Sequence, residues 1–278
     1  MSDATDPAPA PGTPPRADCV ADSAGGITFD IAVVDVAEPV LVLRRRGGSG
    51  GPVSSGGPGP GPVPGGAPDE ARLPLTPAAE GHLRAVLPGT VQLAEGRWDA
   101  YLGDRAVEPG VRDLRALVDR IPDEPDGVRA RVPYPTADGR LAVRSWVRRP
   151  HAEAGDIVLG EGVCTVEGTL YGARCAAGAV AEARLGQAVH RVPAGGEGGA
   201  FAFTVPYDLL AEPPVTSEQL WELWLRPDAG AEPVRVARVL DDVWDRKNVF
   251  VYPAHRGEGY RAAPCYTADN DLCVRLTP

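Results

Sequence analysis

The sequence has little positive charge and a single lysine. Its 278 residues include 28 Lys and Arg against 38 Asp and Glu, for a net charge of −10, and the one lysine is Lys247. Binding to phosphates requires a basic face that displaces counterions. The charge balance therefore argues against a nucleic-acid partner, and we interpret the short arginine runs at 44–46 and 148–149 as solvated strand ends.

Long apolar runs and cysteine motifs are also missing. No stretch approaches the ~20 apolar residues of a spanning helix, and residues 1–24 lack the apolar segment of a signal peptide. We expect a cytoplasmic protein without a transmembrane segment. An odd number of cysteines without C-x-x-C spacing predicts free thiols rather than a disulfide framework or a zinc site; they are Cys19, Cys164, Cys175, Cys265 and Cys273.

Catalytic motifs are absent in the same way. The glycine-rich run at 195–199 lacks the Lys-Ser/Thr of a phosphate loop, and neither Gly-x-Ser-x-Gly nor HExxH occurs. Asp269-Asn270-Asp271 has the spelling of a metal-binding Asp-x-Asp pair, but we interpret it as a turn. We interpret the acidic group around Asp241 as a solvated loop. The sequence thus predicts no catalytic residue, no metal and no cofactor.

An internal repeat organises what is present. The stretch from Pro264 to Arg275 matches the stretch from Pro133 to Arg144, 131 residues upstream, at seven of twelve positions without a gap. In each copy a turn, Asp138-Gly139 or Asp269-Asn270, precedes an alternating apolar segment, which is typical of a β-hairpin. The chain is therefore predicted to use one fold twice.

A second, shorter repeat relates Trp98–Leu102 to Trp221–Leu225 at a spacing of 123 residues. The difference between the two spacings gives the second copy eight extra residues between Leu240 and Pro264. Insertions of this size belong in surface connections. We expect strands at 111–121 and 234–240 in both copies, although the apolar spacing from Val111 to Ile121 is helical.

Turn residues and short alternating segments predict the domain organisation. We expect a disordered leader at 1–24, because it is rich in proline and has no periodicity. A first β-sandwich domain follows at 25–150 with a disordered Gly/Pro-rich insert at 47–71, then a polar linker at 151–156 and a second β-sandwich domain at 157–278. About seven strands in the second domain, together with the repeat, predict an all-β protein of two tandem immunoglobulin-like antiparallel sandwiches. The predicted strands include 249–252, and one helical turn is expected at 207–210.

Aromatic side chains are the candidates for binding. Trp98/Tyr101 and Trp221/Trp224 could form sugar-stacking platforms, but their repetition favours core packing. The insertion of the second copy carries its own aromatic residues. We therefore expect an exposed contact surface formed by Trp244, Phe250, Tyr252 and His255.

The terminal stretch Pro264–Arg275, together with Lys247–Pro253, resembles the C-terminal β-rich regions appended to actinobacterial family 2 glycosyltransferases and teichoic-acid-type glycerophosphotransferases. The resemblance covers mainly residues 220–278. In that family the catalytic residues belong to a preceding nucleotide-sugar domain, which this sequence lacks. No catalytic residue is carried over, and any activity, glycosyl or glycerophosphoryl transfer, is implied by the resemblance alone.

These observations favour a non-catalytic binding or assembly module that serves a cell-wall or surface-polysaccharide glycosyltransferase. Its expected partner is another protein, either that glycosyltransferase or a second copy of the chain, and a glycan is the alternative ligand. Two other readings stay open, a transferase with its site between the domains and a carbohydrate-binding module.

Overall fold

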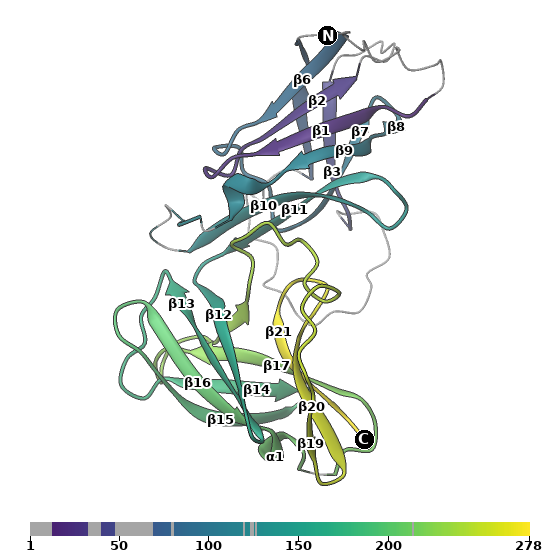
Figure 1. Ribbon diagram of the computed structural model, residues 1–278. Coiled ribbons are helices and arrows are strands. Elements are labelled where there is room, and N and C mark those ends of the chain that lie inside the picture. Colours follow the sequence, from purple (N-terminus) through teal and green to yellow (C-terminus); the bar gives the residue numbers. More distant parts are fainter. Residues whose placement is uncertain are drawn as a thin grey trace, which may run out of the picture. The chain divides into compact units, whose positions relative to one another are not determined.

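The computed structural model describes residues 13–32, 40–47, 69–78, 81–118, 120–122, 125, 127–212 and 214–278. The chain divides into two compact units, unit 1 with residues Met1–Arg120 and Arg129–Val147, and unit 2 with residues Ile121–Val128 and Arg148–Pro278. Strands dominate both units (Figure 1), so the predicted all-β class is confirmed. In the part of the chain described, no helix has the length and apolar character needed to cross a bilayer.

Unit 1 consists of two hydrogen-bonded sheets. The first has the order β5 (Thr76–Pro77), β6 (His82–Leu87), β2 (Ile27–Ala32), β1 (Arg16–Ala21) and β9 (Glu108–Asp113). The second has the order β10 (Val128–Pro135), β11 (Leu141–Arg148), β7 (Gly96–Leu102), β3 (Val40–Arg45) and β4 (Glu70–Pro74), with β8 (Arg105–Ala106) on β7, and a short 3₁₀ turn, η2 (Arg115–Leu117), follows β9. Alternation explains the packing, because every second residue of β2 is buried, beginning at Ile27.

Unit 2 closes its strands into a ring. The order is β14 (Val180–Leu185), β15 (Ala188–Gly195), β16 (Ala200–Pro206), β13 (Val163–Tyr171), β12 (His151–Gly160), β18 (Val234–Ala237) and β17 (Gln219–Arg226), which pairs again with β14. From β17 the sheet continues through β21 (Leu272–Thr277), β20 (Tyr260–Tyr266) and β19 (His255–Gly257). The sequence predicted two separate sheets here; a seven-stranded barrel stands in their place, and its closure leaves none of these seven strands at an open edge.

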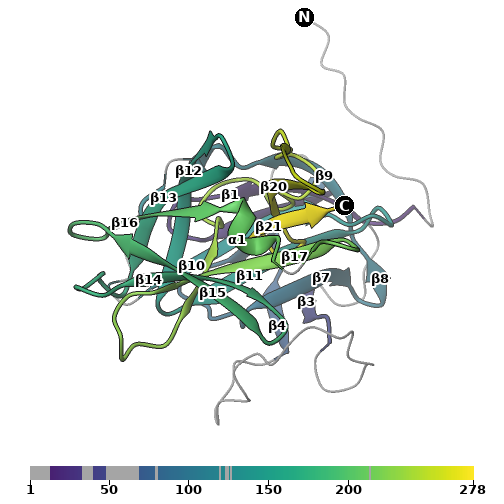
Figure 2. The same cartoon turned by 90° about the horizontal axis from the view of Figure 1, so that it is seen from below.

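The two units pair their strands alike where the sequence repeats. Val143 of β11 lies opposite Trp98 of β7, and Val274 of β21 lies opposite Trp221 of β17. The first strand of each unit also runs parallel to a later one, β1 to β9 and β12 to β18. Both views show β21 beside β17 (Figure 1, Figure 2). We expected strands at 111–121 and 234–240, and both segments begin with strands in corresponding places.

Four predictions about these boundaries need correction. The predicted leader at 1–24 contains β1, in which Ala17, Cys19 and Ala21 are buried at alternate positions. The proline-rich sequence beside this short alternation explains why no strand was predicted here. Residues 1–12 lie outside the described part of the chain. The predicted linker at 151–156 is the start of β12, because small alanines there alternate into the core. The predicted insert at 47–71 overlaps β4, and 48–68 lie outside the described residues.

The fourth correction concerns the predicted strand at 249–252, which has no strand pairing in the structure. Likewise, β9 ends at Asp113, and the helical spacing that follows becomes η2, which buries Leu117. The helical turn predicted at 207–210 is confirmed as α1 (Tyr207–Leu210). All five cysteines are free thiols; three are buried, while Cys175 and Cys265 are half-buried.

Candidate functional site

Residues 241–254, which we call the insertion segment, lie in the stretch where the second copy has its eight extra residues. This segment runs from β18 toward β19 without regular strand pairing. Its two exposed large hydrophobic side chains are Val249, 64% exposed, and Val251, 83% exposed. The residues around them show how an irregular segment is held in place.

Asn270 fastens the insertion segment to the β20–β21 turn. It has a φ of 62° and no exposed surface. Its Nδ2 donates to the Val243 carbonyl oxygen at 2.8 Å, and its Oδ1 accepts the Arg246 amide at 3.1 Å. Its own carbonyl accepts the Arg238 amide at 3.0 Å. One side chain therefore satisfies two backbone groups of a segment that has no ladder of its own.

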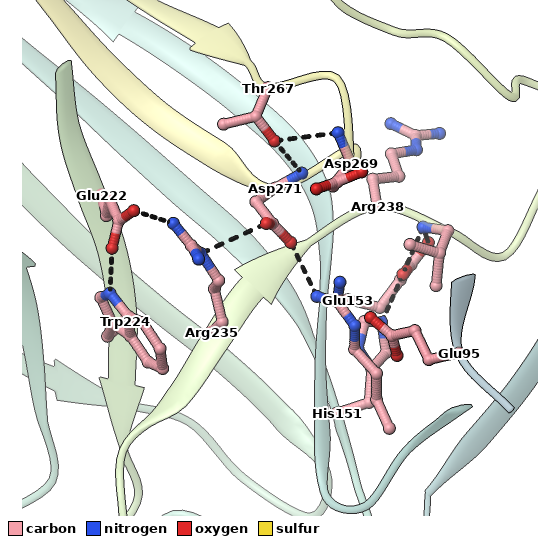
Figure 3. Close-up of polar contacts among 12 residues, drawn as sticks. Glu95, His151, Glu153, Glu222, Trp224, Arg235, Arg238, Thr267, Asp269 and Asp271 are labelled. Atoms are coloured by element: carbon pink, nitrogen blue, oxygen red, sulfur yellow. Dashed lines mark hydrogen bonds and ion pairs between the residues drawn. The ribbon is translucent and has the colours of Figure 1, made fainter. Parts of the chain in front are cut away.

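The turn that carries Asn270 is built by Thr267. Its Oγ1 accepts the amides of Asp269 and Asp271, each at 3.2 Å (Figure 3). In the first copy Thr136 Oγ1 accepts the Arg140 amide at 2.9 Å in the same manner. The first copy has Gly139 where the second has Asn270, and both residues adopt positive φ. The two hairpins thus have the same turn, and in the second hairpin this turn also carries the side chain that holds the insertion segment.

Arg246 is the second fastening point and has no exposed surface. Its Nε donates to the Arg238 carbonyl oxygen at 3.0 Å, and its Nη2 forms an ion pair with Asp241. The guanidinium carbon lies 4.7 Å from the Phe250 ring centre and 5.6 Å from that of Tyr266. Burial, and then the charge of Arg238, lower the pKa of Arg246 to about 10, so it remains charged at neutral pH.

The predicted aromatic residues do not form one exposed surface. Phe250 packs edge-on against Tyr266 at 6.1 Å, and Tyr252 lies 6.5 Å from the same ring, so both bind the segment to the barrel core. His255 belongs to β19, where it stacks on Tyr207 at 5.6 Å and accepts the Gly162 amide.

Trp244, which is half-buried, is the remaining predicted aromatic residue. It lines a cavity of about 370 Å³ within the insertion segment. The other lining residues are Asp242, Val243, Asp245, Asn248 and Val249. The structure therefore brings Trp244 together with exposed Val249 and separates it from His255.

Asp241 and Asp271, two of the acidic residues considered as metal ligands, are engaged with arginines. Asp271 accepts Arg148 Nη1 at 2.7 Å and pairs with Arg235 Nε at 3.3 Å. Arg235 also pairs with Glu222, which accepts the Trp224 indole at 3.3 Å (Figure 3). Among the described residues, no three metal-ligating side chains are grouped as a metal site would require.

A glutamate supports the chain just before the insertion segment. The Glu153 carboxylate accepts the amides of Val239, at 2.9 Å, and Leu240, at 3.0 Å, and contacts His151 Nε2 at 2.7 Å. His151 is fully buried. Sequence reasoning missed both residues because it placed them in a linker.

The aromatic pairs of the two copies divide between core and surface. Trp98 and Trp221 are buried in their cores, as predicted. Tyr101 and Trp224 lie on the opposite strand face and are half-buried beneath arginines, with Arg44 at 5.1 Å from Tyr101 and Arg184 at 4.7 Å from Trp224. Both outer rings are thus covered by cation–π contacts.

No known family model matches the chain, and no curated protein matches it. Two solved structures of S. aureus TarS are similar to it. The one of residues 217–571 has 12% identity and a TM-score of 0.30, and covers 69% of this chain and 55% of its own. The other has 12% identity and a TM-score of 0.29, and covers 68% of this chain and 35% of its own.

This chain therefore spans about half of one TarS structure and about a third of the other. A likeness at these TM-scores supports no conclusion about activity. The resemblance drawn from the terminal repeat stays a prediction.

Proposed function

We propose that the chain is a non-catalytic binding module and that the insertion segment is its contact surface for another protein. The observation that carries the proposal is the exposure of Val249 and Val251 on a segment fixed by the buried Asn270 and Arg246. A pre-fixed segment loses little conformational entropy on association. Apolar side chains beside a half-buried tryptophan are typical of the centre of a protein interface.

The resemblance suggests the class of partner, a cell-wall or surface-polysaccharide glycosyltransferase, in which this chain would act as an assembly component. The test measures binding of a purified glycosyltransferase encoded beside this chain, and self-association, by calorimetry and sedimentation. We expect V251D to weaken binding at least about tenfold, because a buried unpaired carboxylate costs more than 1.4 kcal/mol. V158D is the matched control, since Val158 is 55% exposed on β12 of the same unit.

Equal binding by wild type, V251D and V158D would refute this contact surface. The non-catalytic part of the proposal is tested separately with nucleotide-sugar and CDP-glycerol donors, with and without Mg²⁺ or Mn²⁺. We expect no hydrolysis or transfer. Turnover that D241A abolishes while circular dichroism shows intact folding would establish the transferase alternative.

A carbohydrate is the second candidate ligand, and the Trp244 cavity favours it. An indole with nearby carboxylate and amide groups, here Asp242, Asp245 and Asn248, matches the apolar face and hydroxyl edge of a sugar ring. Asn248 Nδ2 already donates to Asp245 at 2.8 Å, which fixes its orientation. Sugar binding that W244A removes and V251D leaves unchanged would favour this ligand over a protein.

We infer also that the two units descend from one duplicated β fold. The support is the pairing of Trp98 with Val143 and of Trp221 with Val274, which keeps the two sequence spacings. Under this inference the insertion segment is an addition to the second copy, which is where a binding role would be acquired. An experimental structure in which the two hairpins occupy different topological positions would contradict the duplication.

A further inference from the structure

Two cysteines face each other across the hairpin that bears Asn270. Cys265 of β20 lies directly opposite Cys273 of β21 in the antiparallel register. The neighbouring pair joins Pro264 to Val274, and proline has no amide hydrogen to donate. Hydrogen-bonded and non-hydrogen-bonded pairs alternate along such a ladder, so the cysteine pair is the hydrogen-bonded type, with Cα atoms about 5.5 Å apart.

The Cα spacing lies within the disulfide range, whereas the Cβ atoms of a hydrogen-bonded pair, about 5.5 Å apart, must move about 1 Å closer to reach the spacing of bridged cysteines. Bridged cysteines have Cα atoms roughly 4.4–6.8 Å apart, and directly opposed residues project from the same face of a sheet. Cys273 is buried and Cys265 is half-buried, so one thiol of the pair is accessible from solvent. Neither of the other strand cysteines has this arrangement, because Cys19 lies opposite Phe29 and Arg112, and Cys164 lies opposite Leu159 and Val205.

We propose that Cys265 and Cys273 are an oxidation site, which forms a cross-strand disulfide by exchange with a low-molecular-weight disulfide. The Cys265 thiolate attacks one sulfur of that disulfide and releases one thiol. The Cys273 thiolate then attacks the Cys265 sulfur, and the second thiol leaves. The two protein thiols lose two electrons and two protons, and the external disulfide takes them up.

The surroundings set the order and the pH dependence of these steps. Burial raises the pKa of Cys265, and the charge of Arg275 partly opposes it. Burial, and then Cys265 itself, raise the pKa of Cys273. The accessible Cys265, stabilised as a thiolate by Arg275, attacks first. Since both pKa values lie above neutrality, the rate of bridge formation rises about tenfold per pH unit near neutral pH.

The pair belongs to the second copy only. Tyr134 and Ala142 stand in the corresponding places of the first hairpin, so unit 1 has no counterpart. The bridge would close the hairpin around Asn270, the residue that holds the insertion segment. Oxidation is thereby located beside the proposed contact surface, although the disulfide itself does not depend on that proposal.

The test treats the folded chain with oxidised glutathione, unfolds it in acid, alkylates free thiols and digests it with trypsin. Both cysteines fall in one peptide, residues 262–275, between Arg261 and Arg275. We expect this peptide to escape alkylation and to weigh about 2 Da less than the reduced form, reversibly with dithiothreitol. The peptides that contain Cys19 and Cys164 should be alkylated as in the untreated protein.

Two variants separate the bridge from simple adduct formation. C273S removes the resolving thiol, so Cys265 should keep a stable glutathione adduct, whereas C265S should react far more slowly at buried Cys273. The proposal is overturned if both thiols of the folded wild type remain alkylatable after oxidation. It is equally overturned if wild-type Cys265 keeps glutathione and no bridged peptide appears.

Discussion

Replacing Asn270 by glycine tests whether one buried amide fixes the insertion segment. Glycine keeps the positive φ that Asn270 adopts, 62°, and it is the residue of the first copy at Gly139. The substitution removes the hydrogen bonds to Val243 O and from the Arg246 amide. The backbone turn itself should survive, because Thr267 still accepts the two amides that shape it.

The expected loss of stability is about 2.5–4.5 kcal/mol. Leaving the buried Arg246 amide without an acceptor costs about 1–3 kcal/mol, and the partly accessible Val243 carbonyl adds about 1 kcal/mol. Glycine adds a further ~0.5 kcal/mol by widening the unfolded ensemble. Urea unfolding of unit 2 should therefore move to a lower midpoint with an unchanged slope.

The single lysine provides a local assay. Lys247 lies within the insertion segment, so endoproteinase Lys-C cuts the chain only there. If 2 kcal/mol of the loss falls on local opening, the cleavage rate of N270G rises about 30-fold. The control is G139N, because a side chain at Gly139 meets nothing within 4 Å. Unchanged cleavage and midpoint in N270G would refute the role of Asn270.

Two further perturbations test the fold. Burial would raise the pKa of Glu182, but hydrogen bonds from Arg184, Arg226 and Arg191 outweigh it and hold the pKa at about 2. The E182Q variant should therefore lose roughly 3 kcal/mol of unfolding free energy at neutral pH. Measured by urea unfolding, the difference in stability between E182Q and wild type should shrink as the pH falls from 4.5 toward 2. A difference that stays constant with pH would contradict this. Deleting residues through Ala21 removes β1 and should abolish cooperative unfolding of unit 1 in calorimetry, whereas a chain beginning at residue 13 keeps β1 whole.

The sequence predicted what depends on local alternation and on the repeat. The hairpin at Asp269-Asn270 and the inward tryptophans Trp98 and Trp221 follow from a period of two and from turn residues. The strand β1 escaped prediction because Arg16–Ala21 shows six residues of alternation beside a proline-rich run. In so short a segment, the proline-rich composition beside it outweighs the alternation when a strand is predicted from the sequence.

Barrel closure and the contacts of the insertion segment could not be predicted from local patterns. Closure requires β14 to reach β17, which places Glu182 opposite Trp224 across a long sequence separation. Arg246 looks like a solvated loop arginine until Tyr266, Phe250 and Asp241 enclose it. The one available signal was Asn270, because it replaces the glycine of the first copy at a position that needs positive φ.

The replacement of Gly139 by Asn270 is one of several differences between the two copies of the repeat. Register places Val42 opposite Tyr101 in unit 1 and Glu182 opposite Trp224 in unit 2. Thus the position that is apolar in one copy is, in the other, an acidic centre for three arginines. The same holds for Gly139 and Asn270, and for the thiols of the second hairpin. The residues that the two copies share shape strands and turns. The properties specific to unit 2 therefore lie at the positions where the copies differ, and we expect binding and oxidation at those positions.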